Sequence, residues 1–259
     1  AALAAREALG AVVFGACPIL LCLADPQRRD PLAGCDQTLL ADLAQLLGAA
    51  PHPQSQVLPW GRAGAVVALL HARALVQGGQ APGALIVGCD TLLTAGAVAQ
   101  LDERRQLLTP ANSDGVIPAD GAAAVLVTTD PGGLPVAGIA GGPEPVDADP
   151  ALPARADALV AQWRAAAQMA GWTPGAADAR IVDHAGRQED AAEIALALGR
   201  LLRTPQPRMP IWQPAVSLGD CGAALGLAPL VLAHQAWRGG WSLGARVAVL
   251  AIDRLRGWR

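Results

Sequence analysis

The apolar positions of this chain follow two alternating patterns. Short apolar runs bounded by Pro, Gly or Asp are typical of buried strands, and we expect strands at 18–24, 55–58, 84–88, 122–127, 179–182 and 246–252. Segments with apolar residues at helical spacing lie among them, at 1–9, 37–47, 95–108, 154–171, 189–202 and 223–236. The alternation predicts a layered α/β protein with helices on both sheet faces.

One further stretch organises the chain. Val57 to Gly79, VLPWGRAGAVVALLHARALVQGG, predicts the end of a strand, a tight corner at Trp60-Gly61 and a helix that closes on Gly78-Gly79. A surface helix has a polar face, and this one is almost entirely apolar, so we expect it to be central and buried. Its amino end would present unpaired N–H groups and a partial positive charge.

A second stretch repeats these features. Gly61 to Ala65 and Gly219 to Ala223 share a GxxGA corner, and the second apolar helix also closes on a glycine pair, Gly239-Gly240. One repeat of this length predicts two fused α/β halves related by a pseudo-twofold axis. We place the halves at 1–130 and 151–259, joined by the Pro-, Gly- and Asp-rich linker 131–150.

Composition excludes several classes of function. The net charge is −3 without a block of like charge, which argues against nucleic acid or an anionic membrane as partner. No apolar run reaches the roughly 18–20 residues of a membrane span. The five cysteines are scattered, without zinc-ligand spacing, so we expect reduced thiols in a cytoplasmic protein that holds no metal and no cofactor. Ala1 to Leu9 resembles the tail of a helix, and the expected fold lacks its first strand.

Three segments resemble a known family. GALIVGCDTLL (Gly83 to Leu93), NSDGVIPADGAAAVLV (Asn112 to Val127) and SLGDCGAALGLAPLVLA (Ser217 to Ala233) are similar to β-ketoacyl synthases of the thiolase fold. PILLCLADP, LLTPANSDG and RIVD resemble the short ketosynthase-like proteins encoded in some bacterial type VI secretion loci. The resemblance implies an αβαβα stack of two similar halves, normally dimeric, with the strand 55–58 at the dimer seam.

The resemblance also implies where catalytic residues would lie. The nucleophilic cysteine of the family falls at Arg62, which cannot carry an acyl group as a thioester. The histidine loop corresponds to 183–186, where His184 is present without the family's threonines. The second histidine position falls on Ser217, and Asp220 stands where the last histidine of that corner would be. Arg62, Ser217 and Asp220 are therefore degenerate positions, and the remaining catalytic candidates are His184 and Cys221. The alternatives are a loop histidine and a buried apolar cysteine.

One contact is predicted across the repeat. Arg62 and Asp220 occupy equivalent corners, and Arg at a helix start is unfavourable unless a carboxylate pairs with it. We therefore expect an ion pair between them at the former catalytic position. Arg28 and Arg29 are expected to be surface residues.

The leading interpretation is a degenerate ketosynthase-like protein that acts as a binding or assembly partner. The alternatives are an acyltransferase of the 3-oxoacyl-ACP synthase class with Cys221 as a displaced nucleophile, and an inactive subunit paired with an active ketosynthase. Expected partners are a second copy or a related subunit, with an acyl carrier protein or a secretion-system protein as further candidates.

Overall fold

The strands of the chain form two sheets. The computed structural model describes residues 1–10, 16–29, 35–48, 50–143, 155–184, 186–202 and 209–253. The first sheet has the order β2 (Gln56–Leu58), β1 (Ile19–Cys22), β3 (Gly83–Thr91), β4 (Asp120–Thr128), and the second has the order β6 (Ile211–Trp212), β5 (Ala179–Val182), β7 (Val247–Leu250). All pairings are parallel except the antiparallel β3–β4 pair.

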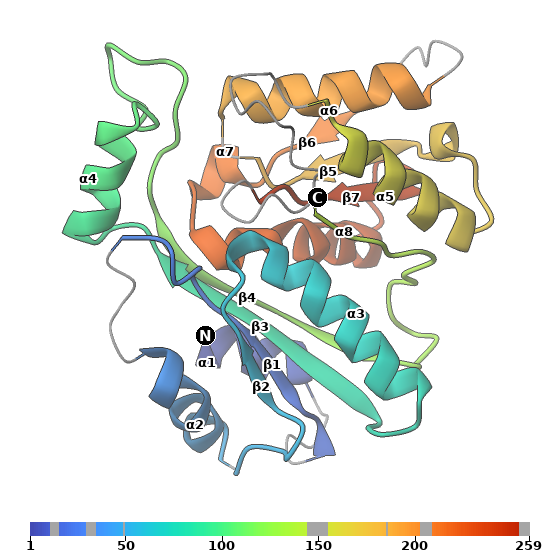
Figure 1. Ribbon diagram of the computed structural model, residues 1–259. Helices are drawn as coiled ribbons and strands as arrows, with labels where there is room; N and C mark the ends of the chain where they lie inside the picture. The colour runs from blue at the N-terminus through green and yellow to red at the C-terminus, as the bar shows by residue number, and fades with distance from the viewer. Residues whose placement is uncertain are drawn as a thin grey trace.

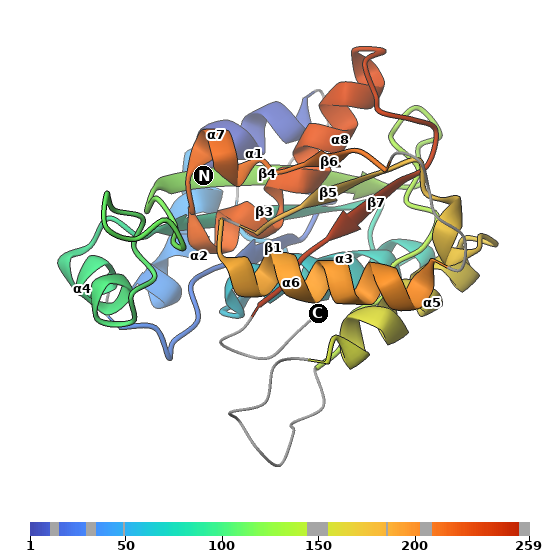
Figure 2. The ribbon, with the colours of Figure 1, turned by 90° about the horizontal axis from the view of Figure 1, so that it is seen from above.

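Helices lie outside and between the two sheets. They are α1 (Ala2–Leu9), α2 (Cys35–Leu47), α3 (Gly64–Gln77), α4 (Ala95–Glu103), α5 (Asp157–Met169), α6 (Gln188–Leu201), α7 (Ala215–Leu218) and α8 (Ala228–Arg238). Helices α1 and α2 cover the outer face of the first sheet, and α5 and α6 cover the outer face of the second (Figure 1). Helices α3 and α8 lie between the two sheets (Figure 1), which completes the predicted αβαβα stack, and Figure 2 views this stack from above.

The side-chain alternation of the strands explains these layers. Successive residues of a strand point to opposite faces. Ile19 and Leu21 of β1 pack with α1 and α2, whereas Leu20 and Cys22 pack with α3 and with Leu227 just before α8. All four β1 residues are buried, as expected for a parallel strand covered on both faces.

The two halves repeat the same arrangement. Strand β1 lies between β2 and β3, and β5 lies between β6 and β7, each parallel to both neighbours. A short 3₁₀ turn precedes each inner helix, at Gly61–Ala63 and Gly222–Gly226. The helix ends also match, because Gly79 and Gly240 have positive φ and donate to the residue three positions earlier. The predicted internal repeat is therefore present in the backbone.

The predicted helix 95–108 is too long. Helix α4 ends at Glu103, and Arg105 has a left-handed φ of 53°. The side-chain amide of Asn112 donates to the carbonyls of Arg105 and Leu107, 2.9 Å in each case. The helix closes at this left-handed residue, because the Arg105 amide donates to the Asp102 carbonyl at 2.9 Å and the Gln106 amide donates to the Leu101 carbonyl at 2.7 Å, which the periodicity did not reveal.

The predicted helix 223–236 also begins too early. Residues 222–226 form a 3₁₀ turn, and α8 starts at Ala228 with Pro229 in its first turn. Proline is favoured there because the N–H groups of the first turn have no helical acceptor. Other predicted elements lie within a few residues of the observed ones.

The connection between the sheets falls where the linker was expected. Strand β4 ends at Thr128 and α5 begins at Asp157. The division into halves at 1–130 and 151–259 stays a prediction, and residues 144–150 of the linker lie outside the described residues. In the part of the chain that the structure describes, no helix is both long and apolar enough to cross a membrane.

Candidate functional site

The corners before the two inner helices meet between the sheets. A Cβ added to Gly226 would lie 2.5 Å from the backbone oxygen of Arg62 and 3.1 Å from the Ala65 Cβ. No side chain fits at that separation, so glycine at position 226 allows the two backbones to touch. This close approach is the reason that residues 158 positions apart share one site.

Arg62 and Asp220 form the predicted ion pair. The Arg62 Nη2 donates to Asp220 Oδ2, and the side chains are only 16% and 8% exposed. Asp220 Oδ1 also accepts from the Gly222 amide at 3.0 Å, and Arg62 Nη1 lies 3.5 Å from the Asp183 carbonyl oxygen. Burial alone would lower the pKa of Arg62, but Asp220 and Asp183 raise it above its ordinary value. The guanidinium is therefore permanently charged.

Further buried carboxylates surround this pair, and sequence reasoning missed them. Asp25, Asp183 and Asp253 follow β1, β5 and β7, and Asp90 lies near the end of β3. Carboxyl ends of parallel strands gather at one edge of a sheet, where ligand sites of α/β proteins are found. An aspartate at the end of each of these apolar runs is the signal that could have identified the cluster.

Arg28 was expected at the surface, and that expectation is wrong. Its side chain is 9% exposed and donates through Nη1 and Nη2 to the two oxygens of Asp90, 2.7 Å each. Asp90 Oδ2 also accepts from the Ala223 amide at 3.0 Å. The pair thus links the loop after β1, strand β3 and the turn before α8. Arg29, by contrast, is exposed and pairs with Glu103, as expected of a surface residue.

A cavity of about 260 Å³ opens beside the two ion pairs. Its charged lining residues are Asp25, Arg28, Arg62, Arg104, Arg187, Glu189, Asp190, Asp220 and Asp253. Charges of both signs come from both halves, and no thiol of the described side chains lines the space. Among the described residues, no three His, Cys, Asp or Glu side chains are arranged to hold a metal ion.

Asp183 is the carboxyl group whose titration is most changed by this environment. It is 1% exposed, and its carboxylate oxygens accept from the Ile252 amide at 3.1 and 3.3 Å. Burial raises the pKa of Asp183 to about 8, with Arg62 opposing the rise and Asp190 and Asp253 adding to it. The site therefore retains a proton at neutral pH.

We expect the free energy of unfolding to fall as pH rises, because Asp183 binds this proton more tightly in the folded chain than in the unfolded one. The pKa of Asp183 is near 8 in the folded chain and about 3.9 in an unfolded one. Its favourable contribution to the free energy of unfolding is therefore fully present when the pH is below the pKa of the unfolded chain. That contribution is lost as pH rises towards 8, at up to about 1.4 kcal/mol per pH unit. Asp183→Asn should flatten this part of the stability curve in urea unfolding, while Asp102→Asn on an exposed residue should not. Parallel curves for wild type and Asp183→Asn would contradict the assignment.

His184 lies next to the cluster but is held by a neutral partner. It is 6% exposed, and its ring contacts the Gln213 amide from the segment after β6. Burial lowers the pKa of His184, and the nearby Arg62 lowers it further, while Asp190 opposes them. A neutral imidazole paired with an amide is consistent with a structural histidine. Its catalytic role stays a prediction.

Cys221 and Ser217 do not line the cavity beside Arg62. Both line a different hollow, between β4 and α8. Burial raises the pKa of Cys221 to about 11, and Asp220 adds to the rise. The group is therefore a thiol at neutral pH, whereas acyl transfer requires the thiolate. Cys17, Cys22 and Cys89 are likewise not part of a disulfide.

The NSDG segment makes structural contacts between the halves. Asp114 Oδ1 accepts from the Gln188 amide at the start of α6, 2.6 Å away. A Cβ on Gly115 would lie 2.6 Å from the Leu107 carbonyl carbon, so only glycine fits. The segment that carries most of the family resemblance thus positions a loop and a helix start.

The layers and the paired inner helices define a thiolase-like fold of the ketosynthase type. Among solved structures, the chain is similar to the ketosynthase from module 6 of the bacillaene synthase of Bacillus subtilis 168. The TM-score is 0.69 at 14% identity, over 86% of this chain and 43% of that one. It is also similar to AbyA1, a tetronic acid condensing enzyme, with a TM-score of 0.61 at 21% identity over 100% and 79% of the chains.

A third similar structure is AntDE:AntF, described as a type II acyl-carrier protein in complex with its ketosynthase. Its TM-score is 0.63 at 17% identity, over 76% of this chain and 53% of that one. The chain spans less than half the length of the bacillaene ketosynthase, and these identities establish the fold alone. No family model matches the sequence. No curated protein matches it either.

Proposed function

We propose that the chain is a non-catalytic ketosynthase-like protein that works by binding other proteins. The observation that carries the proposal is the ion pair between Arg62 and Asp220, at the position where the resemblance places the nucleophile. A guanidinium there cannot accept an acyl group. The nearest candidate thiol, Cys221, lines a different hollow.

The proposal includes partners. We infer a dimer with a second copy or with a related subunit, with β2 at the seam as the family resemblance implies. The neighbour AntDE:AntF joins a ketosynthase to an acyl-carrier protein, which supports a carrier protein as a candidate. The association with type VI secretion and the cytoplasmic location rest on the sequence alone. Affinity purification from the native host, followed by mass spectrometry, tests a related subunit, a carrier protein and secretion-system proteins as partners.

The competing function is acyl transfer by Cys221, and it predicts different chemistry. We expect iodoacetamide to modify Cys221 slowly at neutral pH and faster as pH approaches about 11, because only the thiolate reacts. Peptide mass spectrometry would follow the modification, with the half-buried Cys89 as an internal comparison. We also expect no acyl transfer from wild type or from Cys221→Ala with malonyl and acyl carrier substrates. Turnover by wild type that Cys221→Ala abolishes would overturn the non-catalytic proposal.

A further inference from the structure

Strand β4 is an edge strand without the usual protection. It pairs with β3 along nine consecutive residues in unbroken register, and within the described residues no strand pairs with its other edge. Natural edge strands are blunted by charges, proline, bulges or shortness. After Asp120, β4 contains only Gly, Ala, Val, Leu and Thr. An unblunted edge of this length is a template for another strand.

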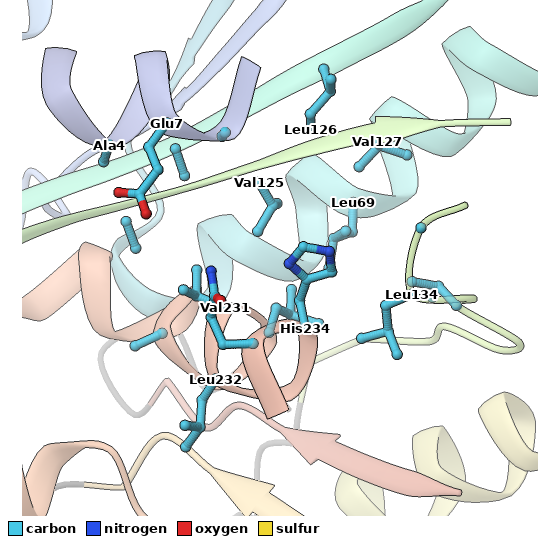
Figure 3. A pocket seen from close by; sticks show the side chains of 18 of the residues that line it. Ala4, Glu7, Leu69, Val125, Leu126, Val127, Leu134, Val231, Leu232 and His234 are labelled. Atoms are coloured by element: carbon cyan, nitrogen blue, oxygen red, sulfur yellow. The ribbon is translucent and has the colours of Figure 1, made fainter. Parts of the chain in front are cut away.

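This edge lies in a recess with apolar walls. A hollow of about 1510 Å³ is lined by all nine residues of β4, by α1 on one side and by α8 on the other. Figure 3 shows Ala4 and Glu7 of α1 on one side of the strand and Val231 and His234 of α8 on the other. The volume exceeds the roughly 300–1,000 Å³ of small-molecule pockets. A recess flanked by helices admits one strand more readily than a second flat sheet.

The charged residues that line the hollow differ in net sign between the two ends of β4. Asp120 begins β4, and Glu7 lies on α1. Arg73 lies on α3, four residues before its last residue Gln77, and Arg238 ends α8, whose first turn lies near the start of β4. Asp130 also lines the hollow, two residues beyond the end of β4, where it faces two arginines, so the net charge of that end is positive. An incoming strand therefore complements these charges if it carries a basic residue near Asp120 and an acidic residue near Arg73 and Arg238.

We propose that the β4 edge receives one extended segment of a partner protein, in antiparallel pairing. The segment is aliphatic on both faces, because one face meets Ala4 and Ala8 and the other meets Val231 and Leu230. Its acidic end lies over Arg73 and Arg238, and its basic end over Asp120. Backbone hydrogen bonds to β4 supply affinity, and the alternating side chains supply selectivity. The surface is separate from the Arg62 cavity. The inference rests on the proposed function, since it names the edge and the kind of segment through which the chain would bind a partner.

A labelled peptide tests the proposal directly. The probe is a fluorescein-labelled octapeptide with Glu first, three Val-Ala repeats and Lys last, and its binding is followed by fluorescence anisotropy. Alternate N–H groups of a strand point to opposite edges, so N-methylation of one alternate set should weaken binding at least tenfold. N-methylation of the other set should have a much smaller effect. Exchanging the terminal Glu and Lys should also weaken binding.

Variants of the protein supply the matching control. Val231→Glu on the α8 wall should weaken binding at least tenfold, whereas Leu196→Glu on the exposed face of α6 should not, with circular dichroism melting curves confirming that both fold. Absence of saturable binding, or equal binding of both methylated peptides, would overturn the proposal. A dimer in sedimentation that Val231→Glu alone dissociates would also overturn it, because the occupant would then be a second copy.

Discussion

Arg62→Met is expected to lower the free energy of unfolding by about 3–5 kcal/mol, the cost of removing one partner of a buried ion pair. Asp220 is 5% exposed and would lose its guanidinium partner, keeping only the Gly222 amide. Asp190 and Asp253, which also act electrostatically on Arg62, would lose the positive charge as well. Urea unfolding at neutral pH measures the change.

A second substitution separates charge from packing. Arg62→Met combined with Asp220→Leu removes both charges, and replacing a whole buried pair with apolar residues is often neutral. We therefore expect the double variant to recover much of the loss. Arg29→Met breaks an exposed pair with Glu103, at 57% and 59% exposure, and should change stability by at most about 1 kcal/mol. A loss from Arg62→Met as small as that from Arg29→Met would contradict a buried, energetically coupled pair.

Asp90→Ala is expected to cost a similar amount, about 3–5 kcal/mol. The substitution leaves the Arg28 guanidinium buried without the carboxylate that accepts two of its hydrogen bonds. It also leaves the Ala223 amide without its acceptor, at the turn that brings Gly226 against Arg62. The effect should appear as a lower urea midpoint with an unchanged slope.

A graded series tests the assignment of each bond. Asp90→Asn keeps an oxygen for the Ala223 amide but loses the charge, so its loss should lie between those of wild type and Asp90→Ala. Asp102→Ala, on an exposed residue of α4, should stay within about 0.5 kcal/mol of wild type. Equal stabilities of Asp90→Ala and Asp102→Ala would show that the Arg28 pair contributes nothing.

Periodicity and the repeated corners determined most of the architecture. Strand β1 is apolar at every position because both faces are covered, and that pattern is visible in the sequence alone. The two GxxGA corners predicted the duplication, and the resemblance to the thiolase fold, in which the starts of the two inner helices approach each other, implied the Arg62–Asp220 pair. Helix boundaries were less predictable. Helix α4 ends at a left-handed Arg105, and the periodicity of apolar residues does not indicate such a residue.

Residue type alone did not separate surface arginines from buried ones. Arg28 and Arg29 are adjacent, yet one is buried against Asp90 and the other is exposed. Their environments differ because the loop after β1 turns one side chain towards the strand ends and the other towards α4. The local sequence does not indicate in which direction the loop points each of these two side chains.

The sequence by itself determined the layered fold and the duplication, and it predicted Arg62 at the position that the resemblance assigns to a nucleophile. Only the tertiary structure decided which side chains surround Arg62. It gathered Asp25, Asp90, Asp183 and Asp253 from four separate strand ends, and it placed Cys221 in the lining of a different hollow from the one that Arg62 lines. The physical reason is that burial and pairing are properties of chain segments brought together by folding. Each aspartate is an ordinary acid in the sequence, and the opposing strand or helix end determines its hydrogen bonds and charge.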